Sequence, residues 1–249
     1  MARFGIFSDI HGNLEALQSV LQAIERDGVE DLVNLGDSVG YNANPRECLN
    51  LMRTRGVFSI LGNHDLAAFE PRLAESFNVL AHQALQYSRD QLEPADFDYL
   101  RAMPQLHTLE DRYLLCHGSP ENIESYIGNM FQAKRTFNLL KKQFTRIRIC
   151  FFGHTHFQKL WTCDHRGKVT TIKPLPSSLS LDPDNSYLIN PGSVGQPRQG
   201  DNRAHYLIFD ADREEVQFMA VAYDIARAQN KILRARLPEY LALRLQDGV

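Results

Sequence analysis

Five short motifs in this chain carry side chains that bind metal ions in proteins. Together they contain three carboxylates, one amide and five imidazoles, and no thiolate is among them. Oxygen and nitrogen donors of this kind suit Mn, Fe, Zn, Ni or Co better than a structural zinc site built from cysteines. Each motif alone is weak, but the five together predict a metal centre. The motifs are Asp9-x-His11, Gly36-Asp37, Gly62-Asn63-His64-Asp65, His117-Gly118 and Gly153-His154-x-His156.

Each motif follows a short apolar run that is typical of a strand. In an open α/β sheet, ligands bind at the carboxyl ends of strands, where loops from separate strands meet. We therefore expect the motifs to converge on one edge although they lie far apart in the sequence. Asp9 and His11 are two residues apart, as are His154 and His156, so on extended backbone each pair would point to one side.

The spacing of apolar residues predicts the elements that position these motifs. We expect a helix from Leu14 to a stop at Gly28, a second helix that begins at Asn44, and a third over 129–144. Strands that alternate with helices predict an α/β fold with a βαβ open sheet. Residues 67–103 indicate a helical insertion, and one domain over 1–249 is the expected organisation. Strands are expected over 3–8, 31–35, 57–61, 113–116, 147–152, 158–162, 168–173, 187–190, 205–210 and 215–222, before closing helices from Ala222 and beyond Pro238.

In order and spacing, the five motifs resemble those of the calcineurin-like metallophosphoesterase superfamily. The resemblance is closest to its compact bacterial and archaeal phosphodiesterase branch, and Asn190-Pro191-Gly192-Ser193 extends it toward the C-terminus. It implies a four-layer αββα sandwich of two mixed sheets with a dinuclear centre at the strand ends. Two divalent metal ions are therefore expected as cofactors, with manganese favoured over Fe, Zn, Ni or Co.

The resemblance also implies a role for each donor. Asp37 would bridge the two ions, and His64 would be a catalytic residue that faces the substrate phosphate rather than a ligand. The segment from Gly36 to Gly40 lacks the Asp-Arg pair of the phosphoprotein phosphatases in this superfamily, which leaves the usual carboxylate partner of His64 unidentified. One ion would be held by Asp9, His11 and His156, and the other by Asn63, His117 and His154.

The expected reaction is hydrolysis of a small phosphodiester, nucleotide or phosphomonoester by a hydroxide that bridges two metal ions. One alternative is a nuclease, which would need an aromatic groove and strong salt dependence. Another is a protein-interaction scaffold, because this fold serves without catalysis in the retromer coat. A scaffold can lose metal donors without cost, whereas here every donor and His64 are present.

Composition narrows the setting in which this activity is expected. The 249 residues carry a formal net charge of −3, which is too mild to indicate bulk nucleic-acid or membrane binding. The sequence has no run of eighteen apolar residues and no signal-peptide core at its start, so we expect a cytoplasmic protein. Its four cysteines form no Cys-x-x-Cys pair and are expected to be reduced thiols. A homo-oligomer is left open.

Several features near the motifs allow two interpretations. Asn13 could contact substrate or cap the following helix, and Arg198 could bind phosphate or form a structural salt bridge. Between Ser125 and Cys163 there is no Asp or Glu, but seven Lys or Arg residues occur, including Lys141 and Lys142. This basic segment could attract an anionic substrate or be a solvated helix face. The helices over 67–103 could form a lid or simply cover one flank.

Overall fold

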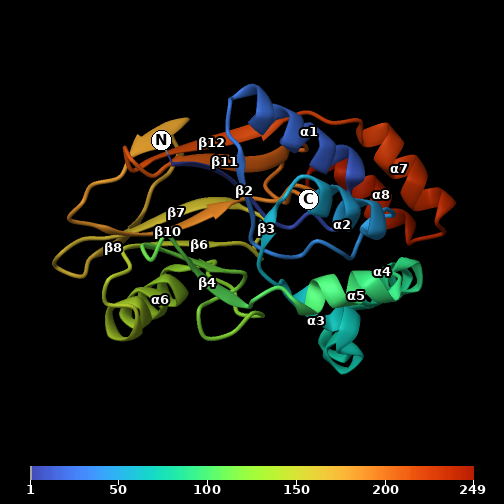
Figure 1. Ribbon diagram of the computed structural model, residues 1–249, viewed down its shortest axis with the longest axis horizontal. Helices are drawn as coiled ribbons and strands as arrows, with labels where there is room; N and C mark the ends of the chain where they lie inside the picture. Colours follow the sequence, from blue (N-terminus) through green and yellow to red (C-terminus); the bar gives the residue numbers. More distant parts are fainter. Residues whose placement is uncertain (1) are drawn as a thin grey trace.

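Two six-stranded mixed sheets form the centre of the protein in a computed structural model, which describes residues 2–249. The sheets pack face to face, and helices cover their outer faces (Figure 1). On the first sheet lie α1 and α2, with α7 and α8 beside α1; on the second lies α6, and α3 to α5 lie at one end (Figure 1). The expected αββα sandwich is therefore confirmed.

The first sheet has the strand order β3-β2-β1-β11-β12-β9. Strands β1, β2 and β3 run parallel, whereas β11 is antiparallel to β1. Helices α1 (Leu14–Arg26) and α2 (Pro45–Thr54) make the two parallel crossovers. The strands are β1 (Arg3–Phe7), β2 (Asp31–Asn34), β3 (Phe58–Ser59), β9 (Ser178–Ser180), β11 (Ala204–Asp210) and β12 (Glu215–Val221).

The second sheet has the order β4-β5-β6-β10-β7-β8. Strands β5, β6 and β10 run parallel, and α6 (Met130–Gln143) connects β5 to β6. Strands β7 and β8 add an antiparallel flank beside β10. The strands are β4 (Leu106–Leu109), β5 (Tyr113–Cys116), β6 (Ile149–Phe152), β7 (Gln158–Cys163), β8 (Val169–Thr171) and β10 (Ser186–Pro191).

The main core lies between the two sheets and draws residues from both. Phe209 of the first sheet makes edge-on contacts with Tyr113 and Phe151 of the second, at ring-centroid distances of 4.9 and 5.1 Å. Aromatic pairs in this arrangement contribute about 0.5–1.5 kcal/mol beyond their buried area. The contacts fix how one sheet lies over the other, and with it the relative position of loops from different sheets.

The helical residues after β3 form α3 (Asn63–Phe69), the 3-10 helix η1 (Pro71–Ser76), α4 (Val79–Gln91) and α5 (Pro94–Arg101). Helix α3 begins four residues earlier than the expected insertion, so Asn63 and His64 lie in its first turn. The chain closes with α7 (Ile225–Arg234) and α8 (Glu239–Asp247), and Lys231 of α7 forms a 2.6 Å ion pair with Glu15 of α1. Within residues 2–249, no helix combines the length and apolar character needed to cross a membrane.

Candidate metal centre

The five motifs converge at the end of the sandwich where the parallel strands of both sheets end. Asp9 and His11 follow β1 and Asp37 follows β2, all in the first sheet, while His117 follows β5 of the second sheet. Because loops leave both sheets at this end, the site lies across the seam between them. All seven expected metal ligands are buried, with relative exposures of 0–7%: Asp9, His11, Asp37, Asn63, His117, His154 and His156.

One group of donors consists of Asp9, His11 and His156. His156 Nε2 lies 3.3 Å from Asp9 Oδ1 and 3.2 Å from His11 Nε2. The Nδ1 atoms of His11 and His156 lie 3.0 and 2.6 Å from the carbonyl oxygens of Val39 and Gln196. A carbonyl can only accept, so each Nδ1 donates its proton and each Nε2 presents a lone pair toward the group.

The arrangement of this first group is more favourable with a cation bound between the side chains than without one. Burial lowers the pKa of His11 and of His156 well below the ordinary value, so both rings are neutral. Their two Nε2 lone pairs face each other, and the buried Asp9 Oδ1 has no hydrogen-bond partner. Unpaired buried acceptors of this kind cost free energy unless a positive charge lies between them. The donor set is therefore arranged for a metal ion.

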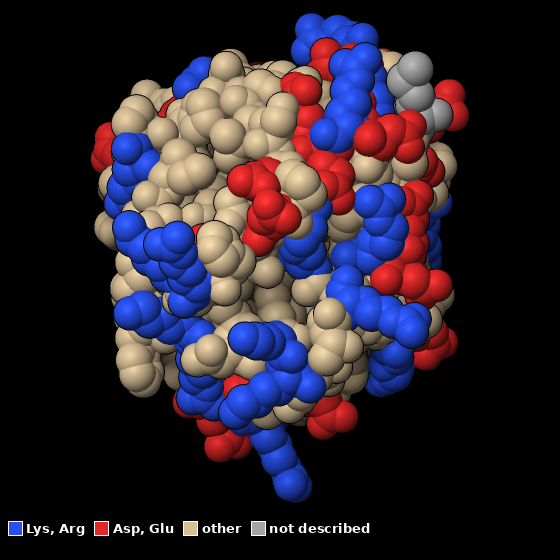
Figure 2. All heavy atoms as spheres, turned by 90° about the vertical axis from the view of Figure 1, so that its left-hand side faces the viewer, with Lys and Arg blue, Asp and Glu red and all other residues tan. Residues whose placement is uncertain are grey.

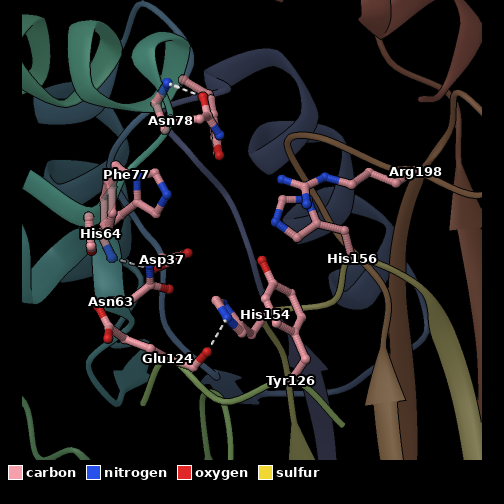
Figure 3. Close-up of a pocket in the computed structure, with 13 residues that line it drawn as sticks. Asp37, Asn63, His64, Phe77, Asn78, Glu124, Tyr126, His154, His156 and Arg198 are labelled. Atoms are coloured by element: carbon pink, nitrogen blue, oxygen red, sulfur yellow. Dashed lines mark hydrogen bonds between the residues drawn. The ribbon is translucent and has the colours of Figure 1, made fainter. Parts of the chain in front are cut away.

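A second group consists of Asp37, His117 and His154. His117 Nε2 lies 3.3 Å from Asp37 Oδ2 and 3.1 Å from Asn63 Oδ1, which adds the amide to the group. His117 Nδ1 donates to the carbonyl of Leu35 at 2.8 Å. His154 is oriented the other way, because its Nε2 contacts the Glu124 carbonyl at 3.0 Å and leaves Nδ1 for the group (Figure 3).

Asp37 connects the two groups. Its Oδ2 lies 3.6 Å from His11 Nε2 and 3.3 Å from His117 Nε2, so one carboxylate oxygen reaches a ligand of each group. Burial raises the pKa of Asp37, but the surrounding imidazoles, His117 first, outweigh this and hold it well below the ordinary value. The same pairing raises the pKa of His117 to about 9 against the effect of burial. A bound cation would replace the proton that His117 otherwise carries.

The backbone at the donors is left-handed rather than extended. The φ angles are 56° at Asp9, 48° at His11, 57° at Asp37, 65° at His154 and 62° at His156. The expectation that extended backbone aligns each pair is therefore wrong, and the side chains meet because the loops turn back on themselves. Left-handed backbone costs an L-residue about 1–2 kcal/mol. Strain repeated at five donor positions is typical of a functional site.

The Asn190-Pro191-Gly192-Ser193 segment holds these strained loops in place. Asn190 Nδ2 donates to the carbonyl of Gly153 at 2.7 Å, directly before His154. Ser193 Oγ donates to the Asp9 carbonyl at 2.9 Å. The segment thus connects the loop after β1 in one sheet to the loop after β6 in the other. None of its residues is a candidate metal ligand.

His64 lies beside the two groups, and its backbone N–H donates to Asp37 Oδ1 at 2.8 Å. Its ring packs against Tyr41 and Phe77, at centroid distances of 4.8 and 4.7 Å. Burial lowers the pKa of His64 to about 4, and its Nδ1 has no hydrogen-bond partner among residues 2–249. No carboxylate among these residues accepts a hydrogen bond from His64 Nδ1. A nitrogen of His64 also lies within reach of His11 and Asp37.

Asp65, the third carboxylate of the five motifs, supports the neighbouring loops through hydrogen bonds. Its carboxylate accepts from the backbone N–H groups of Ser38, Val39 and Gly62 at 2.8, 3.1 and 3.1 Å. Burial, with the nearby charge of Asp37, raises the pKa of Asp65 to about 7. Asp65 thereby ties the Asp37 loop to the start of α3. Because Asp65 directly follows Asn63 and His64 in the motif, the sequence alone did not show whether it binds a metal ion or accepts hydrogen bonds from the backbone.

A pocket of about 260 Å³ opens onto the two groups. Figure 3 shows Asp37, Asn63, His64 and Phe77 on one side, and Tyr126, His154, His156 and Arg198 on the other. Tyr126 stacks on the His154 ring at a centroid distance of 4.1 Å. The Arg198 guanidinium points into the pocket and lies 5.9 Å from the centre of the Tyr41 ring. The pocket therefore combines the candidate metal ligands with one cation and several aromatic rings.

The family is decided by comparison with known proteins. The model of the calcineurin-like phosphoesterase superfamily domain matches residues 2–214 of this chain. The chain belongs to the calcineurin-like phosphoesterase superfamily. Members of this superfamily are metal-dependent phosphoesterases, so a hydrolase activity on phosphoester bonds is supported at this level.

Relatives of the chain in this superfamily match it along most of its length. It is 34% identical to the uncharacterized protein MJ0912 of Methanocaldococcus jannaschii, over 98% of this chain and 97% of that protein. It is 25% identical to phosphodiesterase YfcE of Escherichia coli K12, over 85% of this chain and 89% of that protein. The crystal structure of a metallophosphoesterase from Sphaerobacter thermophilus has a TM-score of 0.84 and 38% identity, covering 99% of each chain.

Of the two residues expected to contact substrate, Arg198 and Asn13, only Arg198 lines the pocket. Arg198 lines the pocket and donates to Gln196 Oε1 through Nε and Nη2, at 3.2 and 2.7 Å. Asn13 is not among the residues that line it. Both polar atoms of Asn13 are already used, because Oδ1 accepts from Ala16 N at 3.1 Å and Nδ2 donates to Gly195 O at 3.1 Å. Asn13 is the N-cap of α1, the alternative considered above.

The basic segment contributes little to the pocket. Lys141 and Lys142 lie in the last turn of α6, which leads into the start of β6, whereas His154 follows the end of β6. These lysines are therefore at the opposite end of the sheet from the candidate metal centre. Figure 2 shows Lys and Arg side chains in the lower part of the face at this end, with Asp and Glu among them. The geometry favours a solvated helix face for α6.

Proposed function

We propose that the protein hydrolyses a phosphoester bond in a small phosphodiester, nucleotide or phosphomonoester, with two divalent metal ions as cofactors. One observation carries the proposal: Asp37 Oδ2 lies between the Nε2 atoms of His11 and His117, at 3.6 and 3.3 Å. A single carboxylate shared by two groups of buried donors is the arrangement that a pair of cations requires. Superfamily membership agrees with this assignment.

The donor set indicates which residues would hold each ion. Asp37 would serve both ions, and the absence of thiolates favours manganese or another borderline metal. When bound, the two ions would supply Lewis-acid stabilisation of phosphate charge and a water of lowered pKa. The remaining ligands would be Asp9, His11 and His156 for one ion, and Asn63, His117 and His154 for the other.

Two further residues would act on the substrate directly. His64 is held by its backbone contact to Asp37 and faces the pocket, so its ring N–H would donate a hydrogen bond to a phosphate or leaving oxygen. Arg198 would bind a non-bridging oxygen, since its guanidinium points into the pocket. Tyr41 and Phe77 pack around His64 and limit the access of water to it.

A protein-interaction scaffold does not require this arrangement. The donors are buried, their lone pairs face one another, and strained backbone holds them in place. Such features cost stability, and a surface that only binds another protein would gain nothing from them. The nuclease alternative lacks a long basic groove, because the lysines at the end of α6 lie away from the pocket.

The test combines metal analysis with an assay on bis-p-nitrophenyl phosphate. The manganese-loaded protein should bind about two ions per chain and hydrolyse the diester. Asp37→Asn should abolish turnover while the fold remains, and Asp98→Asn serves as a matched control because Asp98 is exposed on α5. Near-normal turnover by Asp37→Asn would refute the bridging role, and an inactive wild-type protein that binds no metal would refute the function.

A further inference from the structure

A second cavity, of about 540 Å³, adjoins the pocket that opens onto the metal ligands. Tyr126 and Arg198 line both, so they form the boundary between the two spaces. The other lining residues include Lys159 on β7 and Lys173, which follows β8. None of the cavity's lining residues is acidic. A group bound in the first pocket could therefore extend past Arg198 into a space of positive charge.

The positive charge in this cavity is not balanced by carboxylates. The ion pairs described for residues 2–249 include none of the three cations Lys159, Lys173 and Arg198. Lys159 Nζ donates to the carbonyl of Gly128 at 2.9 Å, and Arg198 donates to the neutral Gln196 side chain. Glu124 lines the metal pocket but not this cavity. An anion would thus meet three cations that have no acidic partner.

Two of these cations lie near each other, Lys159 on β7 and Lys173 two residues beyond the end of β8. The antiparallel register of β7 and β8 pairs Trp161 with Thr171, and Ile172 N donates to Leu160 O at 3.2 Å. Continuing this register places Lys159 opposite Lys173. Like charges directly opposite each other destabilise a sheet. Burial together with Lys173 lowers the pKa of Lys159, as expected when two ammonium groups lie close together without an anion between them.

Two exposed aromatic rings lie beside the cations. Tyr126 is 50% exposed although it stacks on His154, and Phe157 is 42% exposed. Exposed rings next to uncompensated cations are suited to a ligand that has a flat aromatic part and an anionic part. Tyr126, at the boundary of the two cavities, could contact such a part from either side.

We propose that Lys159 and Lys173, together with Arg198 at the boundary between the two phosphates, form a subsite for a second phosphate next to the scissile one. The inference rests on the proposed function, and it narrows the substrate to an organic pyrophosphate that carries an aromatic group, such as a nucleoside diphosphate or triphosphate. The scissile phosphate would lie at the metal ligands and the second phosphate beyond Arg198. The aromatic group would lie on Tyr126 or Phe157.

The chain provides its own probe for binding at this subsite. Trp161 is the single tryptophan, and Lys159 Nζ lies 4.7 Å from the centre of its ring. An anion that draws the Lys159 ammonium away from the indole should change the fluorescence of Trp161. The experiment titrates the manganese-loaded full-length chain with adenosine, adenosine monophosphate and adenosine diphosphate at constant ionic strength.

We expect the diphosphate to bind about tenfold more tightly than the monophosphate, since one added charge-assisted hydrogen bond is worth about that factor. Lys173→Met should remove this advantage, and Lys173→Glu should weaken binding of the diphosphate further. Both variants keep Lys159 and Trp161, so the fluorescence readout is preserved. Lys141→Met is the matched control, because Lys141 lies on α6 away from both cavities. It should bind both nucleotides as the wild type does.

A second readout separates this subsite from the proposed function. Bis-p-nitrophenyl phosphate has one phosphate, so Lys173→Met should hydrolyse it with unchanged kcat/KM. An inactive wild type that still prefers the diphosphate in a Lys173-dependent way would refute the proposed function and leave the subsite standing. An active wild type that binds both nucleotides equally, or a Lys173→Met variant with the same preference as Lys141→Met, would overturn the subsite.

Discussion

Gly40→Ala should displace His64 without touching a metal ligand. A Cβ at Gly40 would lie 2.5 Å from His64 Nδ1, which is 0.9 Å less than the 3.4 Å at which ordinary contact begins. The ring cannot easily retreat, because Tyr41, Phe77 and His11 surround it at centroid distances of 4.8, 4.7 and 4.9 Å. The substitution must therefore shift or turn the imidazole by roughly 1 Å, an amount that can cost about 100-fold in rate.

The expected result is a fall in kcat of about 100-fold, equivalent to about 2.7 kcal/mol of transition-state stabilisation. The measurement is kcat on bis-p-nitrophenyl phosphate, together with manganese content per chain and the melting temperature. Gly40 has a φ of +96°, so alanine also adds backbone strain of about 1–2 kcal/mol to the folded state. Metal content should be unchanged, since the displaced ring is not assigned as a ligand.

Gly167→Ala is the matched control for the strain alone. Gly167 has a φ of +79°, and a Cβ there would meet nothing within 4 Å. Both variants should lose similar stability, but only Gly40→Ala should lose turnover. Equal kcat values in the two variants would show that Gly40→Ala does not displace His64 from its working position. A loss of manganese from Gly40→Ala would instead identify His64 as a ligand.

His64→Ala should keep its manganese and lose about 10²–10⁴-fold in kcat, the usual contribution of a general acid or base; metal loss measured by elemental analysis would reassign His64 as a ligand. Removing metal with a chelator should lower the melting temperature, because the buried Asp9 and neighbouring donors lose their cation, and an unchanged melting temperature would contradict the metal centre. His205 is fully buried, and burial outweighs the nearby Asp201 carboxylate and lowers the pKa of His205, so below about pH 6.5 the unfolded chain takes up this proton more readily than the folded chain does. Its contribution to stability is thus complete above that pH and is lost as the pH falls, by up to about 1.4 kcal/mol per pH unit. Urea unfolding of wild type should therefore weaken more steeply between pH 6.5 and 5 than that of His205→Gln, and parallel slopes would exclude this effect.

The sequence predicted the elements with strong apolar patterns and missed the short edge strands. Strand β5 has the expected bounds, and α1 ends as expected before Gly28. Strands β4 (Leu106–Leu109) and β9 (Ser178–Ser180) were not expected. Both lie at sheet edges and lack a run of buried apolar residues, so periodicity gives no signal there. The β4–β5 turn uses Glu110 and Asp111 at positive φ, without the glycine that usually marks such a hairpin.

The candidate site was predictable as a set of residues but not as a geometry. The types and order of the donors indicate a metal centre, since each donor follows an apolar run. The left-handed backbone at Asp9 and His154 could not be read from residue types, because it depends on hydrogen bonds from distant segments such as Asn190. Lys173 gave no signal either, since its importance depends on strand register against Lys159.

The candidate metal ligands come from loops of both sheets, so metal binding depends on how the two sheets are aligned. His11 follows β1 of the first sheet and His156 follows β6 of the second, yet their Nε2 atoms lie 3.2 Å apart. Sliding one layer by a single residue along its strands would displace these atoms relative to each other by about 3.3 Å, as much as the distance that now separates them. A variant that keeps its full complement of ions must therefore keep the native stacking of the two layers. Metal stoichiometry thus measures tertiary order that helix and strand content alone would not reveal.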